Sequence, residues 1–341
     1  PVNRGVVLDN TRHLNKILDV DTEKLTARVQ PGLVLDELNR ALKPHGLWFP
    51  VDPSTASRCT LGGMAANTSS GGKSLRYGVM RHNVRAISAI LPDGTKARFN
   101  GAAPKPGSHA DLVADMRALG RREAEEIDAR FPKVQRRVGG YNIDALTGND
   151  VNMAHLLVGS EGTLAYFTEL ELSLAPLPGK KVIGMCHFPT FYAAMDAAQH
   201  LVTLAPQAVE LIDDTMIALG RDIPLFRNTI EAFVTGDPAA LLMVEFAEKT
   251  PEANAAKLAQ LAEMMGDLRM DFTGTGDRWG GVVSITDAKL QGAIAEYRKS
   301  GLNVMMSMKQ DGKPISFVED CAVALPDLAE YTKGLTDIFS R

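Results

Sequence analysis

One long segment, residues 50–84, constrains the fold of this chain more than any other feature of its sequence. It carries two glycine pairs, Gly62-Gly63 and Gly71-Gly72, separated by Asn, Thr and Ser residues. Glycine lets the backbone approach a ligand closely and adopt positive φ, and the polar side chains supply hydrogen-bond donors and acceptors. We expect few of its residues to build a core. Because apolar runs flank the segment, we expect an ordered functional loop that wraps a polar ligand.

A second glycine-containing block, LLVGSEGTLAYFTELELSLAPLP, occupies residues 156–178. Its Glu161 lies between glycines, where a carboxylate can accept hydrogen bonds from backbone N–H groups or from ribose hydroxyls. The alternative for Glu161 is a residue at the start of a helix.

Together the two blocks resemble the FAD-binding signature of the vanillyl-alcohol oxidase / p-cresol methylhydroxylase (PCMH) flavoproteins. The resemblance is closest to the branch of D-lactate dehydrogenases, glycolate oxidases and D-2-hydroxyglutarate dehydrogenases. That branch carries P-x-D-P-S, then T-x-G-G-M-x-A-N-x-S-S-G, then Y-G-x-x-R-x-x-V, and later G-S-E-G-T-L-G-I-x-T. This chain matches in that order, and departs at Ala165 and Tyr166, where the family has Gly and Ile. The resemblance implies that FAD is bound by Pro50, Asp52, Pro53, Thr60, Gly62, Gly63, Asn67, Ser70, Gly71, Tyr77, Gly78, Glu161, Gly162 and Thr168.

Composition argues against several other classes of protein. The 341 residues suggest about two domains, and the contents of 45% hydrophobic and 23% charged residues are ordinary for a globular protein. A net charge of −4 without a Lys/Arg-rich run gives no support to nucleic-acid binding. No apolar stretch approaches the roughly 18 residues of a membrane span. Cys59, Cys186 and Cys321 form no CxxC pair, so we expect neither a disulfide framework nor an iron–sulfur site, and a cytoplasmic location.

The resemblance implies an α+β chain of two domains. Residues 1–176 would form a PCMH-type FAD-binding domain, incomplete at its N-terminus, and 177–341 a truncated ferredoxin-like α+β cap, the C-terminal domain of FAD-linked oxidases. The Pro/Gly-rich run at 174–179 favours a boundary there. The family's glycine-rich pyrophosphate turn and its His-containing C-terminal region have no counterpart in this sequence, so we expect a fragment that lacks material at both ends.

Local patterns predict the elements of both domains. In the first domain we expect strands at 6–9, 25–29, 84–91, 96–99 and 164–174, and helices at 33–42 and 111–130, the latter charged and facing solvent. In the second we expect strand–helix pairs at 181–188 with 191–204, 241–246 with 251–265, and 315–323 with 325–339, and a further helix at 290–300.

Two further glycine patterns favour plain loops. The sequence SGGKS at 70–74 resembles a phosphate-binding loop, but Asn67 stands where that motif has its first glycine. We therefore expect Lys73 to be an exposed loop lysine. Gly274, Gly276 and Gly280 miss the dinucleotide spacing G-x-G-x-x-G by one residue, which favours a loop, with the mouth of a substrate site as its functional alternative. None of the seven histidines pairs at metal-ligand spacing, so we expect no complete metal site; His82 alone lies inside the flavin signature.

In the cap domain the resemblance draws attention to charged side chains. The sequence ELID at 210–213 resembles the family's E-L-x-D segment, for which structural and substrate-side roles are equally open. Arg298 resembles the arginine of the family's W-x-x-R position, which clamps the substrate carboxylate, although Ala295 replaces the Trp. A guanidinium suits that task because it binds a carboxylate bidentately; the alternative is a solvated arginine on a surface helix. Lys309 or Lys313 is expected to supply a second positive contact.

The resemblance implies an FAD-dependent enzyme that oxidises a D-2-hydroxy acid, of the lactate, glycolate or 2-hydroxyglutarate type, by hydride transfer to flavin N5. Its electron acceptor would be a quinone, an electron-transfer flavoprotein or an iron–sulfur centre, and a homodimer is open. Because the family's catalytic base lies in its metal-bearing C-terminal region, we expect this chain to be catalytically incomplete and to bind FAD weakly. Two alternatives remain: a flavin-fold sugar or alcohol oxidase, and a non-catalytic module that no longer binds FAD.

Overall fold

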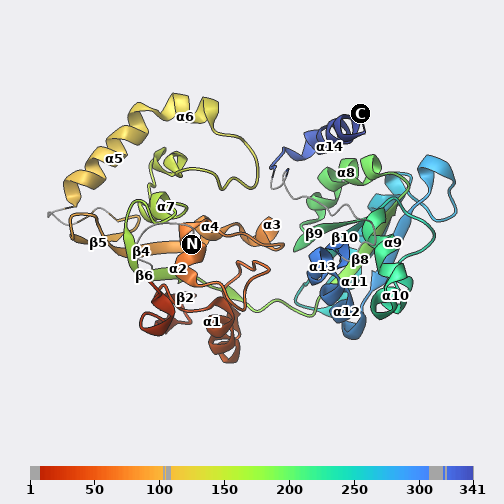
Figure 1. The fold of residues 1–341 in the computed structure, drawn as a ribbon, viewed down its shortest axis with the longest axis horizontal. Coiled ribbons are helices and arrows are strands. Elements are labelled where there is room, and N and C mark those ends of the chain that lie inside the picture. The colour runs from red at the N-terminus through yellow and green to blue at the C-terminus, as the bar shows by residue number, and fades with distance from the viewer. Residues whose placement is uncertain (1–7, 103, 105–108, 307–317, 319–320, 341) are drawn as a thin grey trace. The chain divides into compact units, whose positions relative to one another are not determined.

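The computed structural model describes residues 8–102, 104, 109–306, 318 and 321–340 of the chain (Figure 1). The chain divides into two compact units, Pro1–Leu177 and Pro178–Arg341. Each unit has its own sheet and its own hydrophobic core, as separate domains do.

The first unit is built on a five-stranded antiparallel sheet with the strand order β1-β2-β6-β4-β5 (Figure 1). Its strands are β1 (Ile17–Asp21), β2 (Thr26–Val29), β4 (Val84–Ile90), β5 (Lys96–Phe99) and β6 (Tyr166–Ser173). A separate short pair joins β3 (Leu47–Trp48) to β7 (Ala175–Pro176). The strand β6, which comes late in the sequence, therefore lies between two strands that come early.

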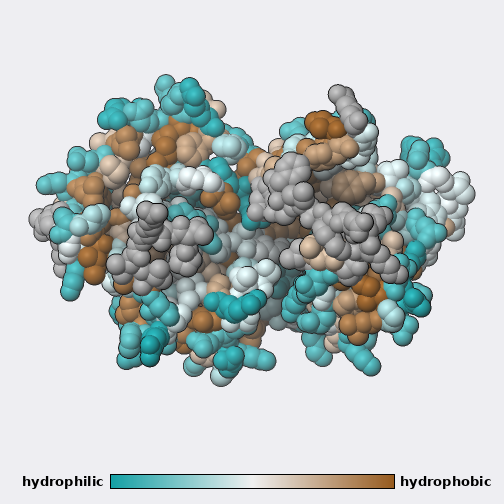
Figure 2. All heavy atoms as spheres, viewed as in Figure 1, coloured by the Kyte–Doolittle hydropathy of each residue, from teal (hydrophilic) through white to brown (hydrophobic). Residues whose placement is uncertain are grey.

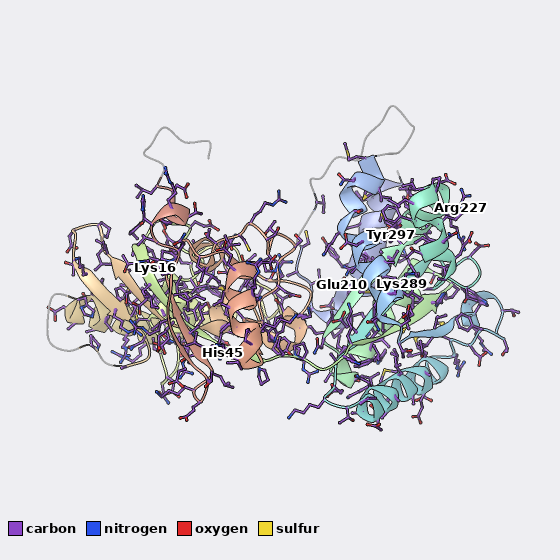
Figure 3. The ribbon with its side chains drawn as sticks, turned by 90° about the horizontal axis from the view of Figure 1, so that it is seen from below. Lys16, His45, Glu210, Arg227, Lys289 and Tyr297 are labelled. Carbon is purple, nitrogen blue, oxygen red and sulfur yellow. The ribbon has the colours of Figure 1, made fainter. Side chains whose placement is uncertain are left out.

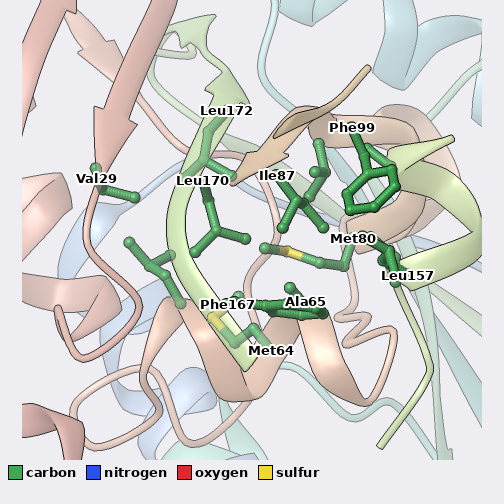
Figure 4. Packing of buried hydrophobic residues seen from close by; sticks show 14 of the residues in the cluster. Val29, Met64, Ala65, Met80, Ile87, Phe99, Leu157, Phe167, Leu170 and Leu172 are labelled. Carbon is green, nitrogen blue, oxygen red and sulfur yellow. The ribbon is translucent and has the colours of Figure 1, made fainter. Parts of the chain in front are cut away.

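Alternation along β6 gives the sheet one apolar and one charged face. Leu170 and Leu172 are fully buried in the core of the unit (Figure 4). Glu169 and Glu171 project from the other face, where the Arg28 Nε lies 2.8 Å from the Glu169 Oε1 and Arg98 pairs with both glutamates. These ion pairs are partly exposed and each contributes little to stability, but they fix which face of the sheet meets solvent.

Helices connect the strands. They are α1 (Leu35–Leu42), α2 (Leu61–Ala66), α3 (Ser74–Tyr77), α4 (Met80–Asn83), α5 (Ala110–Arg122), α6 (Ala124–Arg130) and α7 (Ala154–Leu157), with 3-10 turns η1 (Asn10–Arg12), η2 (Lys43–His45) and η3 (Ile143–Leu146). Three of the helices, α2, α4 and α7, pack on β6 or β4. The predicted strands at 25–29, 84–91, 96–99 and 164–174 and the helix at 33–42 are confirmed as β2, β4, β5, β6 and α1.

The glycine-rich segment at 50–84 contributes only a few residues to the core, as expected. It contains three short helices, and its Leu61, Met64 and Met80 are fully buried. Figure 4 shows Met64 and Met80 in this core. Only a few apolar residues are needed, because each lies on the inward face of a helix that itself packs on the sheet. The segment is therefore anchored to the sheet by these side chains.

Two other expectations for the first unit need correction. The helix expected at 111–130 is broken at Glu123 into α5 and α6, although its outer surface is hydrophilic as predicted (Figure 2). Of the strand expected at 6–9, residues 6–7 lie outside the described residues, and Leu8 and Asp9 are not in a strand. The first described strand is β1, which sequence patterns did not predict because its burial pattern is irregular.

The second unit is built on a four-stranded antiparallel sheet in the order β11-β8-β10-β9. Its strands are β8 (Val182–Phe188), β9 (Ala208–Asp213), β10 (Ala240–Phe246) and β11 (Gly281–Ile285). With α8 (Phe191–Leu201) between the first two and α11 (Pro251–Asp267) between the last two, this is the ferredoxin-like β-α-β-β-α-β arrangement. The expected ferredoxin-like fold is confirmed.

Each face of this sheet carries its own core. One core joins β8 and β10 to α8, α11 and α14 (Leu328–Phe339). The other joins the opposite face to α9 (Asp214–Asp222), α10 (Pro224–Glu231), α12 (Ala288–Lys299) and α13 (Gly301–Met306). Short 3-10 turns complete the unit: η4 (Val202–Leu204), η5 (Gly276–Arg278) and η6 (Leu325–Asp327).

The third predicted strand–helix pair is confirmed only in its helix, which is found as η6 followed by α14. Of the strand expected at 315–323, residues 315–317 and 319–320 lie outside the described residues, and 318 and 321–323 are not in a strand. The remaining two strands of the sheet are β9 and β11 instead. β11 was missed because Gly280 and Gly281, at its start, are typical of a loop.

Candidate functional site

The first wall of the candidate site is the N-terminal turn of α2. Thr60 precedes the helix, and its Oγ1 accepts a hydrogen bond from the Gly63 N–H (N···O 3.3 Å). The Gly62 N–H donates to the Pro31 carbonyl (2.7 Å). A Cβ on Gly62 would lie 2.5 Å from the Pro31 Cβ, so only glycine permits this close contact between α2 and the turn that follows β2.

The second wall is the block that contains Glu161, which docks on the end of α2. The Gly159 N–H donates to the Ala65 carbonyl (2.8 Å) and the Glu161 N–H to the Ala66 carbonyl (2.9 Å). This approach requires positive φ at Gly159 (84°), Glu161 (50°) and Gly162 (74°). The two glycine motifs, far apart in the sequence, therefore meet backbone to backbone.

Between these walls lies a cavity of about 320 Å³, at the small end of the range for ligand pockets. It is lined by Asn10, Pro31, Thr60, Gly62, Gly63, Ala66, Gly162, Ala165, Tyr166 and Phe167. The Tyr166 hydroxyl donates to the Asn10 Oδ1 (2.6 Å), which closes one side. A Cβ on Gly162 would meet no atom within 4 Å, so its backbone faces open space.

Two buried hydroxyls mark the place where the two motifs meet. Thr68 is 2% exposed and Ser160 is fully buried, and neither hydroxyl has a hydrogen-bond partner in the part of the chain that the structure describes. A Cβ on Gly159 would lie 2.4 Å from the Thr68 Oγ1. Buried polar groups are normally paired, so these two atoms are exceptions next to the cavity, although neither residue lines it. Sequence reasoning did not select them; their signal was a hydroxyl residue inside or next to each glycine motif.

The structure brings four of the predicted cofactor residues into this cavity: Thr60, Gly62, Gly63 and Gly162. The other predicted residues do not line it: Pro50, Asp52, Pro53, Asn67, Ser70, Gly71, Tyr77, Gly78, Glu161 and Thr168. Several of these have structural partners. The Thr168 hydroxyl donates to the Ser88 carbonyl (3.1 Å), and the Asn67 Oδ1 accepts from the Ser69 hydroxyl (2.6 Å).

Asp52 fastens the second half of the glycine-rich segment. Its Oδ1 accepts from the Lys73 N–H (3.1 Å) and its Oδ2 lies 3.0 Å from the Lys73 Nζ. The lysine also lies over the Trp48 ring, 5.3 Å from its centre, and Tyr77 packs edge-on against that ring. Lys73 is therefore not the exposed loop lysine we expected: its side chain is 26% exposed, because Asp52 and Trp48 hold it. A Cβ on Gly71 would lie 2.3 Å from the Asp52 carbonyl oxygen.

The turn that follows this segment is held just as firmly. Gly78 has φ of +76°, and a Cβ there would lie 2.5 Å from the His82 Nδ1. That nitrogen accepts a hydrogen bond from the Val79 N–H (3.1 Å). Buried Asn83 donates to the carbonyls of Tyr77 (2.9 Å) and Val79 (3.1 Å). His82, which lies inside the flavin signature, thus stabilises a turn.

In the second unit, Arg298 forms an ion pair with Glu210. Arg298 lies in the last turn of α12 and Glu210 on β9, and their side chains are 33% and 20% exposed. Neighbouring Tyr297 is fully buried, and its hydroxyl donates to the Met216 carbonyl (Figure 3). Burial, with a contribution from Asp213, raises the pKa of Tyr297 to about 12. Arg298 is therefore held in place and is not a freely solvated side chain.

The sequence singles out three other residues of the second unit: Asp213, Lys309 and Lys313. Asp213, at the end of the ELID sequence, caps α9 by accepting from the Met216 N–H (2.8 Å). Lys309 and Lys313 lie outside the described residues. Within the described ranges, no group of three or more His, Cys, Asp or Glu side chains is placed to hold a metal ion. None of the helices that the structure describes is long and apolar enough to cross a membrane.

Comparison with known proteins agrees with this layout. Residues 1–100 match the family model described as "FAD binding domain", and residues 177–341 match "FAD linked oxidases, C-terminal domain". The chain is 30% identical to the D-2-hydroxyglutarate dehydrogenase of Pseudomonas putida over 342 residues, which cover 96% of this chain and 33% of that protein. It is 27% identical to the glycolate oxidase protein GlcD of Bacillus subtilis, over 100% of this chain and 60% of that protein.

These matches extend to a relative that aligns over a shorter stretch of this chain, and to a solved fold. A probable mitochondrial D-lactate dehydrogenase of Danio rerio is 33% identical over 63% of this chain and 35% of its own length. A solved alkyldihydroxyacetonephosphate synthase has the same fold, with a TM-score of 0.57 at 18% identity, over 87% of this chain and 48% of that one. The chain spans about a third of the length of the D-2-hydroxyglutarate dehydrogenases that it matches.

Proposed function

This chain belongs to the FAD-linked oxidases, and from that premise we propose that it acts in the FAD-dependent oxidation of a D-2-hydroxy acid to the 2-oxo acid. The observation that carries the cofactor side of the proposal is the cavity where the two glycine motifs meet. The relatives named as D-2-hydroxyglutarate dehydrogenase, glycolate oxidase and D-lactate dehydrogenase share a 2-hydroxy acid substrate, which supports the substrate class.

The residues present fit FAD. The backbone of Gly62, Gly63 and Gly162 leaves the cavity open for a polar ligand, and the Thr60 side chain lines it as a hydroxyl donor and acceptor. FAD, when bound, supplies a two-electron acceptor for the hydride that leaves the substrate carbon. The protein itself would contribute a backbone that approaches FAD closely and holds it in position.

We propose that Arg298 binds the substrate carboxylate. Glu210 holds the guanidinium through one of its nitrogens, and a second carboxylate can use another edge of the planar fork. Glu210 is thus a positioning residue: it orients the arginine before substrate arrives. Lys309 and Lys313 remain proposals for a second cationic contact.

The electron acceptor, the cellular location and the oligomeric state are also proposals. An acceptor such as a quinone, an electron-transfer flavoprotein or an iron–sulfur centre would re-oxidise the cofactor. A cytoplasmic location agrees with three cysteines that form no disulfide, and a homodimer remains to be tested.

An absorbance spectrum of the purified chain, before and after incubation with FAD and removal of excess ligand, tests the cofactor proposal. The sequence alone predicts weak FAD binding, but the preformed cavity between the two glycine motifs favours retention, and we expect flavin bands to remain with the protein. Gly62→Ala should abolish them, because the added Cβ would lie 2.5 Å from Pro31. Gly101→Ala is the matched control, since its Cβ would meet no atom within 4 Å.

Circular dichroism of both variants shows whether Gly62→Ala has simply failed to fold. A folded wild-type chain that retains no flavin after incubation with saturating FAD contradicts the proposal. Bleaching of the flavin bands by D-2-hydroxyglutarate, D-lactate or glycolate, and not by a sugar, would then separate the 2-hydroxy acid proposal from a sugar oxidase.

A further inference from the structure

We propose that the first unit carries a second binding site, for a small carboxylate with a short apolar body, around Arg81 and Arg137. The two arginines line a cavity of about 300 Å³, which is within the lower range for small-molecule sites. This cavity shares no lining residue with the glycine-lined one. Its long wall, residues 127–147, lies in the part of the chain that neither family model matches.

Three separate elements bring the arginines together. Arg81 lies on α4, directly after the turn fixed by His82 and Val79. Arg137 lies on the segment that follows α6. The third element is η3, which carries Asp144. Arg81 also donates to the Asn142 Oδ1 (3.2 Å), and the Asn142 Nδ2 donates to the Val158 carbonyl (2.7 Å), so the site is tied to the second glycine motif.

The charges in this cavity do not balance. The Asp144 carboxylate accepts from the Arg81 Nη1 (2.9 Å) and also from Arg137. The side chains of Arg81, Arg137 and Asp144 are only 19%, 15% and 23% exposed, respectively. Lys133, the lysine on the wall, is already paired with Asp128. Two guanidinium groups therefore share one carboxylate, which leaves one excess positive charge among partly buried side chains.

Each arginine also keeps hydrogen-bond donors in reserve. Arg81 uses its Nη1, and Arg137 uses its Nη2, toward Asp144. Among the described residues, no acceptor is found for the Nε and Nη2 of Arg81 or for the Nε and Nη1 of Arg137. A pair of adjacent N–H groups on a guanidinium matches the two oxygens of a carboxylate. One such anion would supply the missing negative charge.

The rest of the lining selects the body of the ligand. Five apolar side chains form part of a wall that is otherwise mostly polar: Val79, Ile127, Phe131, Pro132 and Val134. The Phe131 ring lies 4.5 Å from the Arg137 guanidinium carbon, which orients the arginine and leaves its edge to the ligand. One excess charge beside these apolar side chains suits a monoanion with a few carbon atoms better than a phosphate dianion. This inference stands on these contacts and does not depend on the proposed function.

Calorimetric titration of the chain with sodium butyrate, at constant ionic strength, tests the proposal. We expect saturable binding, weakened about tenfold or more in Arg137→Gln, which loses a charged hydrogen-bond donor. Arg130→Gln is the matched control: this arginine lies at the end of α6, is 77% exposed and does not line the cavity. Its butyrate affinity should stay within about twofold of the wild-type value.

Arg137→Lys guards against a variant that merely fails to fold. It keeps the charge and loses the planar fork, so it should bind butyrate more weakly than the wild type at an unchanged melting temperature. Absence of saturable binding, or equal affinity in Arg137→Gln and the wild type, overturns the proposal. Tighter binding of inorganic phosphate than of butyrate overturns the carboxylate assignment. Loss of butyrate binding in excess FAD overturns the claim that this site is separate from the cofactor cavity.

Discussion

Glu210 on β9 holds Arg298 on α12 by an ion pair on the same face of the second sheet that carries buried Tyr297. Met243 of β10 is the cross-strand partner of Glu210, so this face is otherwise apolar around the pair. The pair is partly desolvated, and burial lowers the pKa of Arg298. The arginine proposed for substrate binding is therefore supported by a residue of the core sheet.

Removing this support should cost stability. We expect Glu210→Gln to lower the free energy of unfolding by about 1 kcal/mol, less than for a fully buried pair because Arg298 is a third exposed. Urea unfolding measures the change. Glu296→Gln is the matched control: it breaks a pair with Lys299 on the same helix that is 70% and 69% exposed, and should cost less than about 0.5 kcal/mol. Equal costs in the two variants would contradict the structural role of Glu210.

His187 should make the stability of the second unit depend on pH. It is fully buried, its Nδ1 donates to the Met185 carbonyl (2.9 Å), and its Nε2 accepts from the Thr235 N–H (3.0 Å). Burial lowers the pKa of His187 from 6.5 to about 4. The folded state thus disfavours the proton that the unfolded chain binds below pH 6.5.

The contribution of His187 is therefore complete above about pH 6.5 and is lost as the pH falls toward 4, by about 3 kcal/mol at most. Unfolding free energies of the wild type and of His187→Gln, measured across this range, should converge as the pH falls. A constant difference between wild type and His187→Gln would show that the histidine does not titrate as inferred.

Asp52 should protect the glycine-rich segment from proteolysis. Asp52→Ala removes both bonds to Lys73, so trypsin should cleave after Lys73 or Arg76 several times faster than in the wild type. Asp150→Ala, an exposed change in the same unit, is the control and should leave the cleavage rate unchanged. Mass spectrometry of the early fragments locates the cut. An unchanged rate in Asp52→Ala would mean that the ion pair does not hold the segment.

In the absence of FAD, the wild type with Thr68 should have a lower free energy of unfolding than the variant Thr68→Val. Its buried hydroxyl lacks a partner among the described residues, so Thr68→Val should raise the free energy of unfolding without ligand by about 1 kcal/mol. If the hydroxyl serves the cofactor, the same variant should retain less FAD. Unfolding with and without FAD measures both effects. Stabilisation with unchanged FAD retention would remove Thr68 from the proposed site.

The sequence motifs predicted the position of the glycine-lined cavity better than they predicted the contacts of the individual residues. Gly62 and Gly162 belong to motifs that could be recognised by their letters, and both line the cavity. The hydrogen bond between Gly159 and Ala65 joins residues that no local spacing connects. Asp52 belongs to the same signature, yet its carboxylate binds Lys73. The two residues lie 21 positions apart in the sequence and meet only once the loop has folded, so local patterns do not predict this ion pair.

The elements that sequence patterns missed share a physical cause. β9 and β11 are short, and the charged Glu210 of β9 and the glycines that precede Val282 in β11 hide their strand character. Tertiary packing decides such segments, because β9 pairs along its whole length with β10. By contrast, the long apolar runs of β8 and β10 and the capped helices α8 and α11 predict their own structure.

The place of β6 between β2 and β4 has a consequence for how the first unit is made. The hairpins β1–β2 and β4–β5 form from neighbouring residues, but each keeps an unpaired edge until Tyr166–Ser173 has left the ribosome. Closing the sheet then joins residues such as Arg28 and Glu169, 141 positions apart. Such long-range pairing is slow, and open strand edges invite pairing with other chains. During synthesis of this unit, the hairpins β1–β2 and β4–β5 therefore remain two separate sheets until β6 pairs with both and joins them into one.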